Sequence, residues 1–269
     1  MIKCKDQLNR SIEFLETPKR IISLVPSQTE LLCDLGLEPS LVGITKFCVH
    51  PSHLIKNKTV VGGTKQINLE KIAKLKPDII LCNKEENTLK MIQELKKIAT
   101  VHISDVYNIQ DCTTLIEMYG KLFSVADIAS QIIETIRSKQ LYFIKFIESK
   151  PKLKVAYFIW RDPWMVAGSN TFINSMLELN NFENVFSDLK RYPKVSLPSA
   201  VMLKKVEAIL LSSEPYPFRE KHVEELRFHF PKARIILVDG EYFSWYGSRL
   251  NKAFDYFFKL HQDFLQSPL

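Results

Sequence analysis

The chain has 269 residues, 46% of them hydrophobic, which is enough to bury the core of one large domain or of two modest ones. The net charge of +7 comes from Lys and Arg that mostly alternate with Glu and Asp. Without a block of like charge or a nucleic-acid motif, we expect a solvated basic surface and no nucleic-acid partner. No apolar run reaches the length of a transmembrane span, so we expect no membrane-spanning segment.

From residue 21 onward, short β-branched runs alternate with amphipathic segments, a pattern typical of βα units around parallel sheets. Ser27 and Glu30 have the spacing of a capping box at the start of the first helix. Asn68 is expected to cap a later helix, which Pro77 ends. In this half we expect strands at 21–25, 42–45, 78–82 and 101–104, and helices from 26 and at 69–76, 88–97 and 109–119.

Residues 124–149 contain no Gly or Pro, and their Ile and Phe residues recur at near-helical spacing. Ser124 and Asp127 suggest a second capping box, and Pro151 stops the segment. The pattern predicts one helix of roughly 35–40 Å.

After this helix the βα pattern restarts, with strands expected at 155–160, 208–211 and 234–238, and helices at 171–179, 220–229 and 249–264. The two halves resemble each other, since 74–81 (KLKPDIIL) parallels 203–210 (LKKVEAIL). A repeat of this size predicts an α/β protein with two Rossmann-like lobes and parallel sheets. We therefore expect an N-terminal lobe (1–122), a connecting helix (123–150) and a C-terminal lobe (151–269). One stiff connecting helix should limit hinge motion.

Open α/β sheets bind ligands beyond the carboxyl ends of their strands. The loops at these ends are rich in aromatic residues, include all three tryptophans and carry several cations. If the lobes face each other, the loops converge on one cleft that suits a large, flat or partly apolar ligand with acidic or metal-chelating groups. The alternative is that some of the aromatics pack the lobe interiors. The candidate ligand-binding residues are Phe47, Cys48, Lys65, Lys84, Glu85, Trp160, Arg161, Trp164, Glu214, Tyr216, Phe243, Trp245, Tyr246 and Arg249.

Two other kinds of site receive little support. Cys48 and His50 are both metal-ligating types and point the same way in an extended segment, but no second pair has metal-site spacing, so a polar loop lining the cleft is favoured. No catalytic motif is present, and Glu85 and Glu214 are better interpreted as acids near helix starts than as an acid–base pair. We expect no catalytic residue, no tightly bound cofactor and no enzyme.

The N-terminal segment MIKCKDQLNRSIEF has no apolar run of the signal-peptide type. The five cysteines form no CxxC pair, a usage that suits a reducing compartment. We expect either that a signal is missing from this version of the sequence or that the protein is not exported.

Three stretches resemble one known family. Residues 20–31 (RIISLVPSQTEL) look like the opening motif of the helical-backbone (class III) substrate-binding proteins of ABC transporters. Residues 62–80 contain that family's Gly-Gly loop, its NLEKI helix and its LKPDII strand. Residues 167–174 (AGSNTFIN), with 183–186 (ENVF), are similar to a third motif. The likeness covers nearly the whole chain, and is greatest to the vitamin B12-binding and ferric-siderophore-binding periplasmic proteins.

The resemblance implies two lobes joined by one long helix, a shallow cleft, and a corrinoid or ferric-siderophore-type metal chelate as the ligand. It also implies delivery to an ABC permease from the periplasm or cell envelope. Glu70 matches one of two acidic residues with which the family docks its permease. At the second position this chain has Pro198 and Ser199. We expect a monomer. The alternative is a non-exported, cytoplasmic relative that acts as a carrier, sensor or enzyme on a similar ligand.

Overall fold

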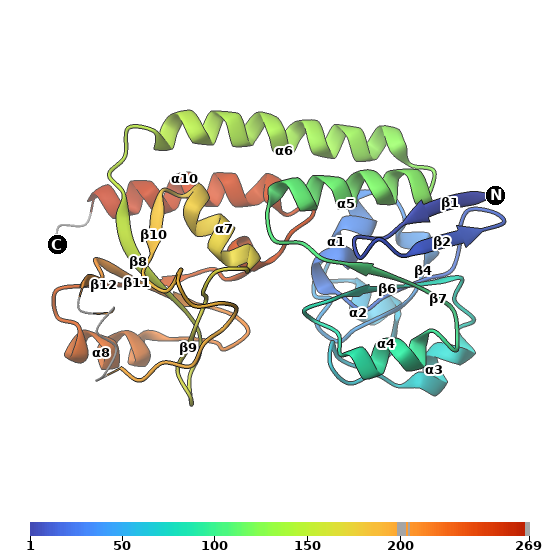
Figure 1. The fold of residues 1–269 in the computed structure, drawn as a ribbon, viewed down its shortest axis with the longest axis horizontal. Coiled ribbons are helices and arrows are strands. Elements are labelled where there is room, and N and C mark those ends of the chain that lie inside the picture. Colours follow the sequence, from blue (N-terminus) through green and yellow to red (C-terminus); the bar gives the residue numbers. More distant parts are fainter. Residues whose placement is uncertain (198–202, 204, 267–269) are drawn as a thin grey trace. The chain divides into compact units, whose positions relative to one another are not determined.

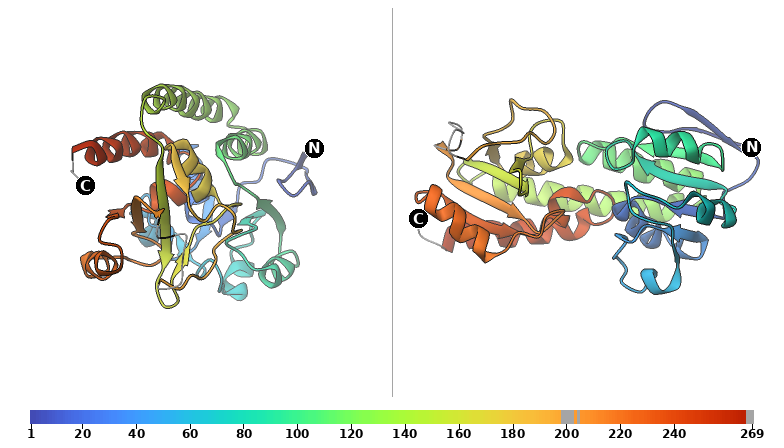
Figure 2. Two further views of the ribbon diagram at one scale, coloured as in Figure 1. Left: turned by 60° about the vertical axis from the view of Figure 1, so that its left-hand side comes forward. Right: turned by 90° about the horizontal axis from the view of Figure 1, so that it is seen from below.

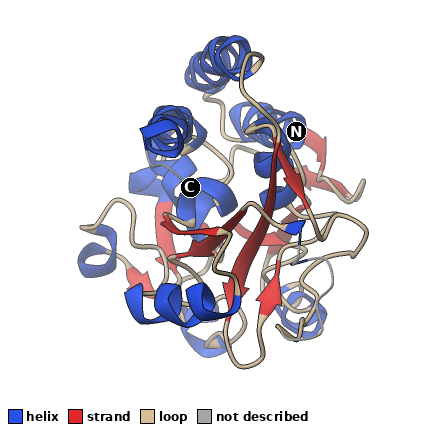
Figure 3. Cartoon of the chain, turned by 90° about the vertical axis from the view of Figure 1, so that its left-hand side faces the viewer, coloured by secondary structure: helices blue, strands red, loops and turns tan. Residues whose placement is uncertain are grey.

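The computed structural model describes residues 1–197, 203 and 205–266, and it divides into two compact units. Unit 1 comprises residues 1–136 together with 245–249, and unit 2 comprises 137–244 and the chain from Leu250 onward. The expected two-lobed α/β fold with parallel sheets is confirmed. In Figure 3 the strands of the sheets lie between layers of helix.

Unit 1 contains a five-stranded parallel sheet in the order β5-β4-β3-β6-β7 and a separate antiparallel hairpin, β1-β2 (Figure 1). Its core includes Ile22, Ile80 and Val101, from the three strands β3, β6 and β7. The elements of unit 1 are β1 (Ile2–Lys5), β2 (Ser11–Phe14), β3 (Ile21–Ser23), α1 (Pro26–Asp34), η1 (Glu38–Ser40), β4 (Leu41–Ile44), α2 (Leu54–Asn57), β5 (Thr59–Val60), α3 (Leu69–Lys74), β6 (Ile79–Asn83), α4 (Leu89–Leu95), β7 (Thr100–Ser104) and α5 (Ile109–Leu122).

Unit 2 contains the parallel strands β10-β8-β11-β12, with β9 antiparallel to β8. Its core includes Phe158, Ile209 and Leu226, from β8, β11 and α8. The elements of unit 2 are β8 (Leu153–Trp160), β9 (Met165–Val166), α7 (Phe172–Leu179), β10 (Phe182–Asn184), β11 (Ala208–Ser212), α8 (Glu220–His229), β12 (Arg234–Val238), α9 (Glu241–Ser244) and α10 (Leu250–Gln266).

The long helix predicted over 124–149 is present as α6 (Ala126–Ile147), a single unbroken helix in Figure 2. Its 22 residues correspond to about 33 Å. The boundary between the two units falls inside it. Ile136 and Phe143 on α6 are completely buried, so the helix is held by packing along one side.

The two predicted capping boxes are wrong. Helix α1 starts directly from the extended Val25, no side chain caps it, and Pro26 at the first position has no N–H that would need a partner. Helix α6 begins two residues after Ser124, which has a left-handed backbone (φ 58°). The predicted cap at Asn68 is confirmed, because its side chain accepts a hydrogen bond from the Lys71 N–H at 2.8 Å.

Side chains of the β1-β2 hairpin cover the outer edge of strand β7. The carboxylate of Asp6 accepts a hydrogen bond from the Ile103 N–H (3.1 Å), and the Arg10 guanidinium donates one to the Val101 carbonyl (2.8 Å). An uncovered edge strand offers unpaired backbone groups to other chains. The hairpin therefore protects the sheet of unit 1 at β7.

Candidate ligand-binding site

The order of strands picks out one position at the carboxyl edge of each sheet. In unit 1, β3 lies between β4 and β6, and in unit 2, β8 lies between β10 and β11. The chain thus moves from the first strand to one neighbour and then to the other. Ligands of open α/β sheets bind beyond the strand ends at such a reversal of strand order. The candidate positions are the ends of β3 and β6 in unit 1, and those of β8 and β11 in unit 2.

In unit 2 this position carries an aromatic pair. Trp160 is the last residue of β8, and 39% of its surface is exposed. Its ring centroid lies 5.7 Å from that of Tyr216, in the loop after β11, with the planes at 68°. Aromatic side chains offer broad apolar contact together with a polar edge. Trp160 and Tyr216, called the aromatic wall below, are the strongest candidates for ligand contact in this unit.

Trp164 and Phe218 support the wall from the interior side. Their rings stack at 5.9 Å with planes only 9° apart, and Trp164 also meets Phe158 edge-on at 5.4 Å. Phe218 is buried in the core of unit 2, and Trp164 packs against that core. Trp164 therefore helps to hold the wall in place.

Arg161 does not present an unpaired charge. Its guanidinium makes two bonds to the Glu225 carboxylate, at 3.0 and 3.1 Å, and a third to Asp162 at 2.8 Å. It also lies over the Trp164 ring, 5.4 Å from the centroid. The charge of Arg161 is compensated by acids of its own unit.

The structure places Glu214 and Phe243 in structural roles. The Glu214 carboxylate accepts a hydrogen bond from the Ser244 hydroxyl and so connects the loop after β11 to α9. Phe243 has no exposed surface and contacts the rings of Tyr157 (5.1 Å) and Phe257 (5.0 Å). A side chain without exposed surface cannot touch a ligand in this conformation, so Phe243 is corrected to a core residue.

In unit 1, Phe47 is the exposed aromatic residue at the strand ends. It lies in the loop after β4 with 48% of its surface exposed, and the Lys46 ammonium sits 5.0 Å from its ring centroid. Lys65, in the loop after β5, is also exposed. These side chains are accessible to a ligand.

Cys48 and His50 do not form a metal site with other residues in the described part of the chain. The Cys48 thiol is completely buried, within 3.2 Å of the Thr29 and Thr45 hydroxyls, and burial raises its pKa. Cys48 is therefore corrected from a cleft residue to a core thiol. His50 packs its ring against Trp245 at 5.4 Å.

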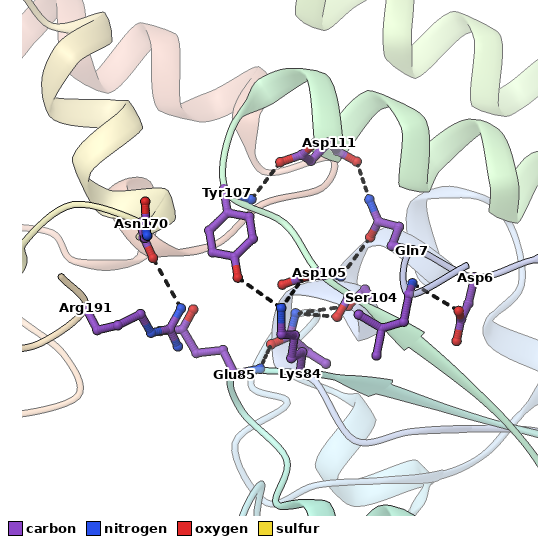
Figure 4. Close-up of polar contacts among 12 residues, drawn as sticks. Asp6, Gln7, Lys84, Glu85, Ser104, Asp105, Tyr107, Asp111, Asn170 and Arg191 are labelled. Carbon is purple, nitrogen blue, oxygen red and sulfur yellow. Dashed lines mark hydrogen bonds and ion pairs between the residues drawn. The ribbon is translucent and has the colours of Figure 1, made fainter. Parts of the chain in front are cut away.

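Lys84 follows β6, and its charge is paired inside unit 1. Its ammonium lies between the Asp105 carboxylate (2.6 Å) and the Tyr107 hydroxyl (3.3 Å), as Figure 4 shows. The hydrogen bond to Asp105 raises the pKa of Lys84. The neighbouring Glu85 donates its backbone N–H to Asn83 Oδ1 at 2.8 Å.

Residues 245–249 form a buried segment of unit 1. The Arg249 guanidinium donates to the Glu30 carboxylate at 2.7 and 3.1 Å and lies over the Trp245 ring, 4.8 Å from its centroid. The Tyr246 hydroxyl accepts a hydrogen bond from the Gln28 side-chain amide at 2.8 Å. Trp245, Tyr246 and Arg249 are each at most 7% exposed. They hold the segment in place, so all three are corrected from cleft residues to structural ones.

The expected docking acid Glu70 is exposed in the first turn of α3. The second position, Pro198 and Ser199, lies outside the described residues. Glu207 accepts a hydrogen bond from the Lys154 N–H at 2.8 Å, at the start of β8.

Two functional candidates were not predicted from the sequence: His222, whose ring lies 3.2 Å from the Tyr216 hydroxyl, and Glu225, which binds Arg161. Both lie on α8, at its third and sixth positions, in a helix for which the sequence predicted no functional residue. Their spacing from Tyr216 offered no signal of contact.

Two α/β units with aromatic strand-end loops define the class as a two-lobed binding protein. The chain belongs to the periplasmic binding protein family, whose sequence model matches residues 21–226. Within the described residues, no helix is both long and apolar enough to cross a bilayer.

Individual relatives agree with this assignment. The chain is 29% identical over 195 residues to the uncharacterized ABC transporter substrate-binding lipoprotein YvrC of Bacillus subtilis; the match covers 68% of the chain and 60% of that protein's length. It is 27% identical over 244 residues to the vitamin B12-binding protein of Pectobacterium carotovorum, covering 87% and 84%.

Solved structures share the fold. The periplasmic vitamin B12 binding protein BtuF of Vibrio cholerae superposes with a TM-score of 0.79 at 19% identity, covering 93% of this chain and 99% of the other. The periplasmic haem-binding protein RhuT of Roseiflexus gives 0.78 at 17%, covering 91% and 98%.

Proposed function

We propose that this protein binds a corrinoid at its strand-end loops, with the aromatic wall of unit 2 as the principal contact, and delivers it to an ABC permease. Membership of the periplasmic binding protein family and a relative named as a vitamin B12-binding protein support this proposal. The observation that carries it is the wall itself, in which an exposed Trp160 meets Tyr216 at the reversal of strand order.

The charges of the predicted ligand-binding residues in the two units favour a corrinoid over a ferric siderophore. A polyanionic chelate needs cations that are not already compensated. Three of the four predicted ligand-binding cations are paired with acids of their own unit: Lys84 with Asp105, Arg161 with Glu225, and Arg249 with Glu30. A large ring system with amide side chains instead matches exposed aromatic faces and neutral hydrogen-bonding groups.

Calorimetry with cyanocobalamin, haemin and ferric citrate tests the ligand class. We expect cyanocobalamin to bind, and Trp160→Ala to weaken it by roughly thirtyfold, as for a large aromatic contact worth about 2 kcal/mol. Phe228→Ala is the matched control, since Phe228 is an 86% exposed aromatic on α8 away from the strand ends. Unchanged binding in Trp160→Ala would contradict the site, and binding of ferric citrate alone would contradict the ligand class.

Glu70 is the proposed permease contact of unit 1, because it is exposed and lies in the first turn of α3. With the permease and its ATPase reconstituted in vesicles, we expect Glu70→Ala to reduce ligand-stimulated ATP hydrolysis without changing cyanocobalamin affinity. Glu94→Ala, which removes a partly exposed acid on α4 whose partner is Lys97, serves as the control. Equal stimulation by wild type and Glu70→Ala would contradict this contact.

We propose a location in the cell envelope, as for the family. Fractionation of the native cells tests this. Recovery of the native protein from the cytosol would contradict both the location and the importer role.

A further inference from the structure

The side chain of His222 is held in one orientation at the start of α8. His222 is 3% exposed, and its Nδ1 atom accepts a hydrogen bond from the Arg219 backbone N–H at 2.9 Å. A ring nitrogen that accepts a hydrogen bond carries no proton. In the neutral ring, the proton of His222 is therefore on Nε2.

The proton on Nε2 determines the direction of the next hydrogen bond. Nε2 lies 3.2 Å from the Tyr216 hydroxyl oxygen. Because Nε2 is the donor, the phenol oxygen of Tyr216 is the acceptor in this contact. The O–H of Tyr216 is then not used by His222, and it can donate to another group.

The surroundings of His222 keep the ring neutral. Burial lowers the pKa of His222, and the positive charges of Lys221 on α8 and Arg161 after β8 lower it further, while Glu225 on α8 acts in the opposite direction. Protonation would also place a proton on Nδ1 and break the bond from the Arg219 N–H. The donor role of Nε2 therefore holds at neutral pH.

The ring of Tyr216 is positioned as firmly as its oxygen. Its centroid lies 4.8 Å from that of Phe218, 5.4 Å from that of His222, and 5.7 Å from that of Trp160. Tyr216 remains partly exposed. Its hydroxyl is thus a fixed polar point on the aromatic wall.

We infer that His222 is a positioning residue that sets Tyr216 as a hydrogen-bond donor to a carbonyl oxygen of the bound ligand. This rests on the proposed function, which places the ligand against the wall. The ligand group that the pair recognises is a neutral acceptor such as a carboxamide, the side-chain group of corrinoids. Apolar contact with Trp160 would then supply most of the affinity, and Tyr216 the orientation.

The first test needs no ligand. In protein labelled with ¹⁵N-histidine, long-range ¹H–¹⁵N spectra distinguish the two neutral tautomers, and the loss of one signal in His222→Gln assigns it. We expect His222 to show protonated Nε2 and unprotonated Nδ1 at pH 7. The opposite tautomer, or a charged ring, would overturn the inference.

The second test is a double-mutant cycle with cyanocobalamin measured by calorimetry. Tyr216→Phe removes the donor and keeps the ring, and we expect a loss of about fivefold to tenfold. His222→Gln keeps a side chain that can cap α8 from the same position but removes the bond to Tyr216, so a loss of about threefold is expected. The double variant should bind like Tyr216→Phe alone.

The outcomes separate the two proposals. If the fold-loss of affinity in the double variant equals the product of the two single-variant losses, His222 does not act through Tyr216. The inference then fails while the proposed function stands. If cyanocobalamin does not bind, or if Trp160→Ala binds like the wild type, the proposed function fails and the ligand contact of Tyr216 fails with it. A matching melting temperature for His222→Gln and Phe228→Ala confirms that the effect is not loss of folding.

Discussion

The two units share a strand order but use their strand ends differently. In unit 1, polar side chains near these ends bond to one another in the interior: the Gln28 amide, just after β3, donates to the hydroxyl of Ser104 at the end of β7 (2.6 Å) and to that of Tyr246 (2.8 Å). In unit 2, the corresponding ends carry the exposed ring of Trp160 and the partly exposed Tyr216.

This difference shows that residue type alone does not identify a binding residue. Trp160 ends strand β8, and Trp245 follows β12 and α9 in sequence, but only 7% of Trp245 is exposed, against 39% of Trp160. In unit 1 the groups near the strand ends bind residues 245–249, whereas in unit 2 two aromatic rings at the strand ends remain accessible. Substitutions that separate stability from binding can test this comparison.

The largest effect is expected at the buried ion pair of unit 1. Glu30→Ala leaves the Arg249 guanidinium, 5% exposed, without its acid, and we expect a loss of about 3–5 kcal/mol in the free energy of unfolding. Urea denaturation followed by fluorescence measures it. The control is Glu38→Ala, because Glu38 pairs with His53 at 2.9 Å on the surface, where such pairs contribute about 0–1 kcal/mol. Similar losses in both variants would contradict a structural role for the buried pair.

The second prediction compares the two tryptophans directly. Trp245→Ala should lower the free energy of unfolding by about 3 kcal/mol, because it removes a buried ring that contacts His50 and Arg249. Trp160→Ala should lower it by about 1 kcal/mol while weakening cyanocobalamin binding. Urea denaturation and calorimetry on the same two variants measure both quantities. The reverse pattern would mean that unit 1, and not unit 2, presents the ligand-binding tryptophan.

Much of the fold could be predicted because its long elements carry their own periodicity. The strand and helix at 234–238 and 220–229 were predicted at their observed bounds, and the helix α6 within two residues at each end. The hairpin β1-β2 and the short strands β5, β9 and β10 were missed, since two to four residues are too few to show a pattern.

The candidate site was predicted less well, for a physical reason. The topology rule selected the loops at the strand ends, but exposure within a loop depends on tertiary packing. Cys48 and Phe243 look like loop residues in the sequence, yet neighbouring hydroxyls enclose the first and aromatic rings enclose the second. His222 was missed because only the folded structure brings α8 beside Tyr216.

The third prediction concerns acid stability. Burial lowers the pKa of His102 in β7 from 6.5 to about 4, and no described residue bonds to either ring nitrogen. Because the pKa of His102 is lower in the folded protein than in the unfolded chain, the free energy of unfolding is highest above pH 6.5. It falls by about 1.4 kcal/mol per pH unit as the pH decreases from 6.5 towards 4. At pH 5 the loss is about 2 kcal/mol.

His102→Phe should remove this part of the pH dependence, measured by urea denaturation at pH 7 and pH 5. His261 in unit 2 offers the comparison, since burial lowers its pKa to about 4 as well, although its Nε2 lies 3.1 Å from Asn180 Oδ1. We expect His261→Phe to flatten the pH dependence of unit 2 in the same way. If the free energy of unfolding of His102→Phe still falls by as much as that of the wild type between pH 7 and pH 5, His102 is not the cause of the acid sensitivity.

The smallest effects are expected at two helix caps, one in each unit. Thr171 is 2% exposed; its hydroxyl accepts from the Asn174 N–H (3.1 Å) and donates to the Gly168 carbonyl (2.8 Å), so Thr171→Ala should cost about 1.5 kcal/mol. Asn68 makes its one capping bond at the surface, and Asn68→Ala should cost about 0.5–1 kcal/mol. Thermal and urea unfolding of the two variants measure the difference. A larger loss of unfolding free energy in Asn68→Ala than in Thr171→Ala would mean that the burial of a cap residue does not determine how much it stabilises the protein. Because neither Thr171 nor Asn68 belongs to the aromatic wall, we expect neither variant to change cyanocobalamin affinity by more than about twofold.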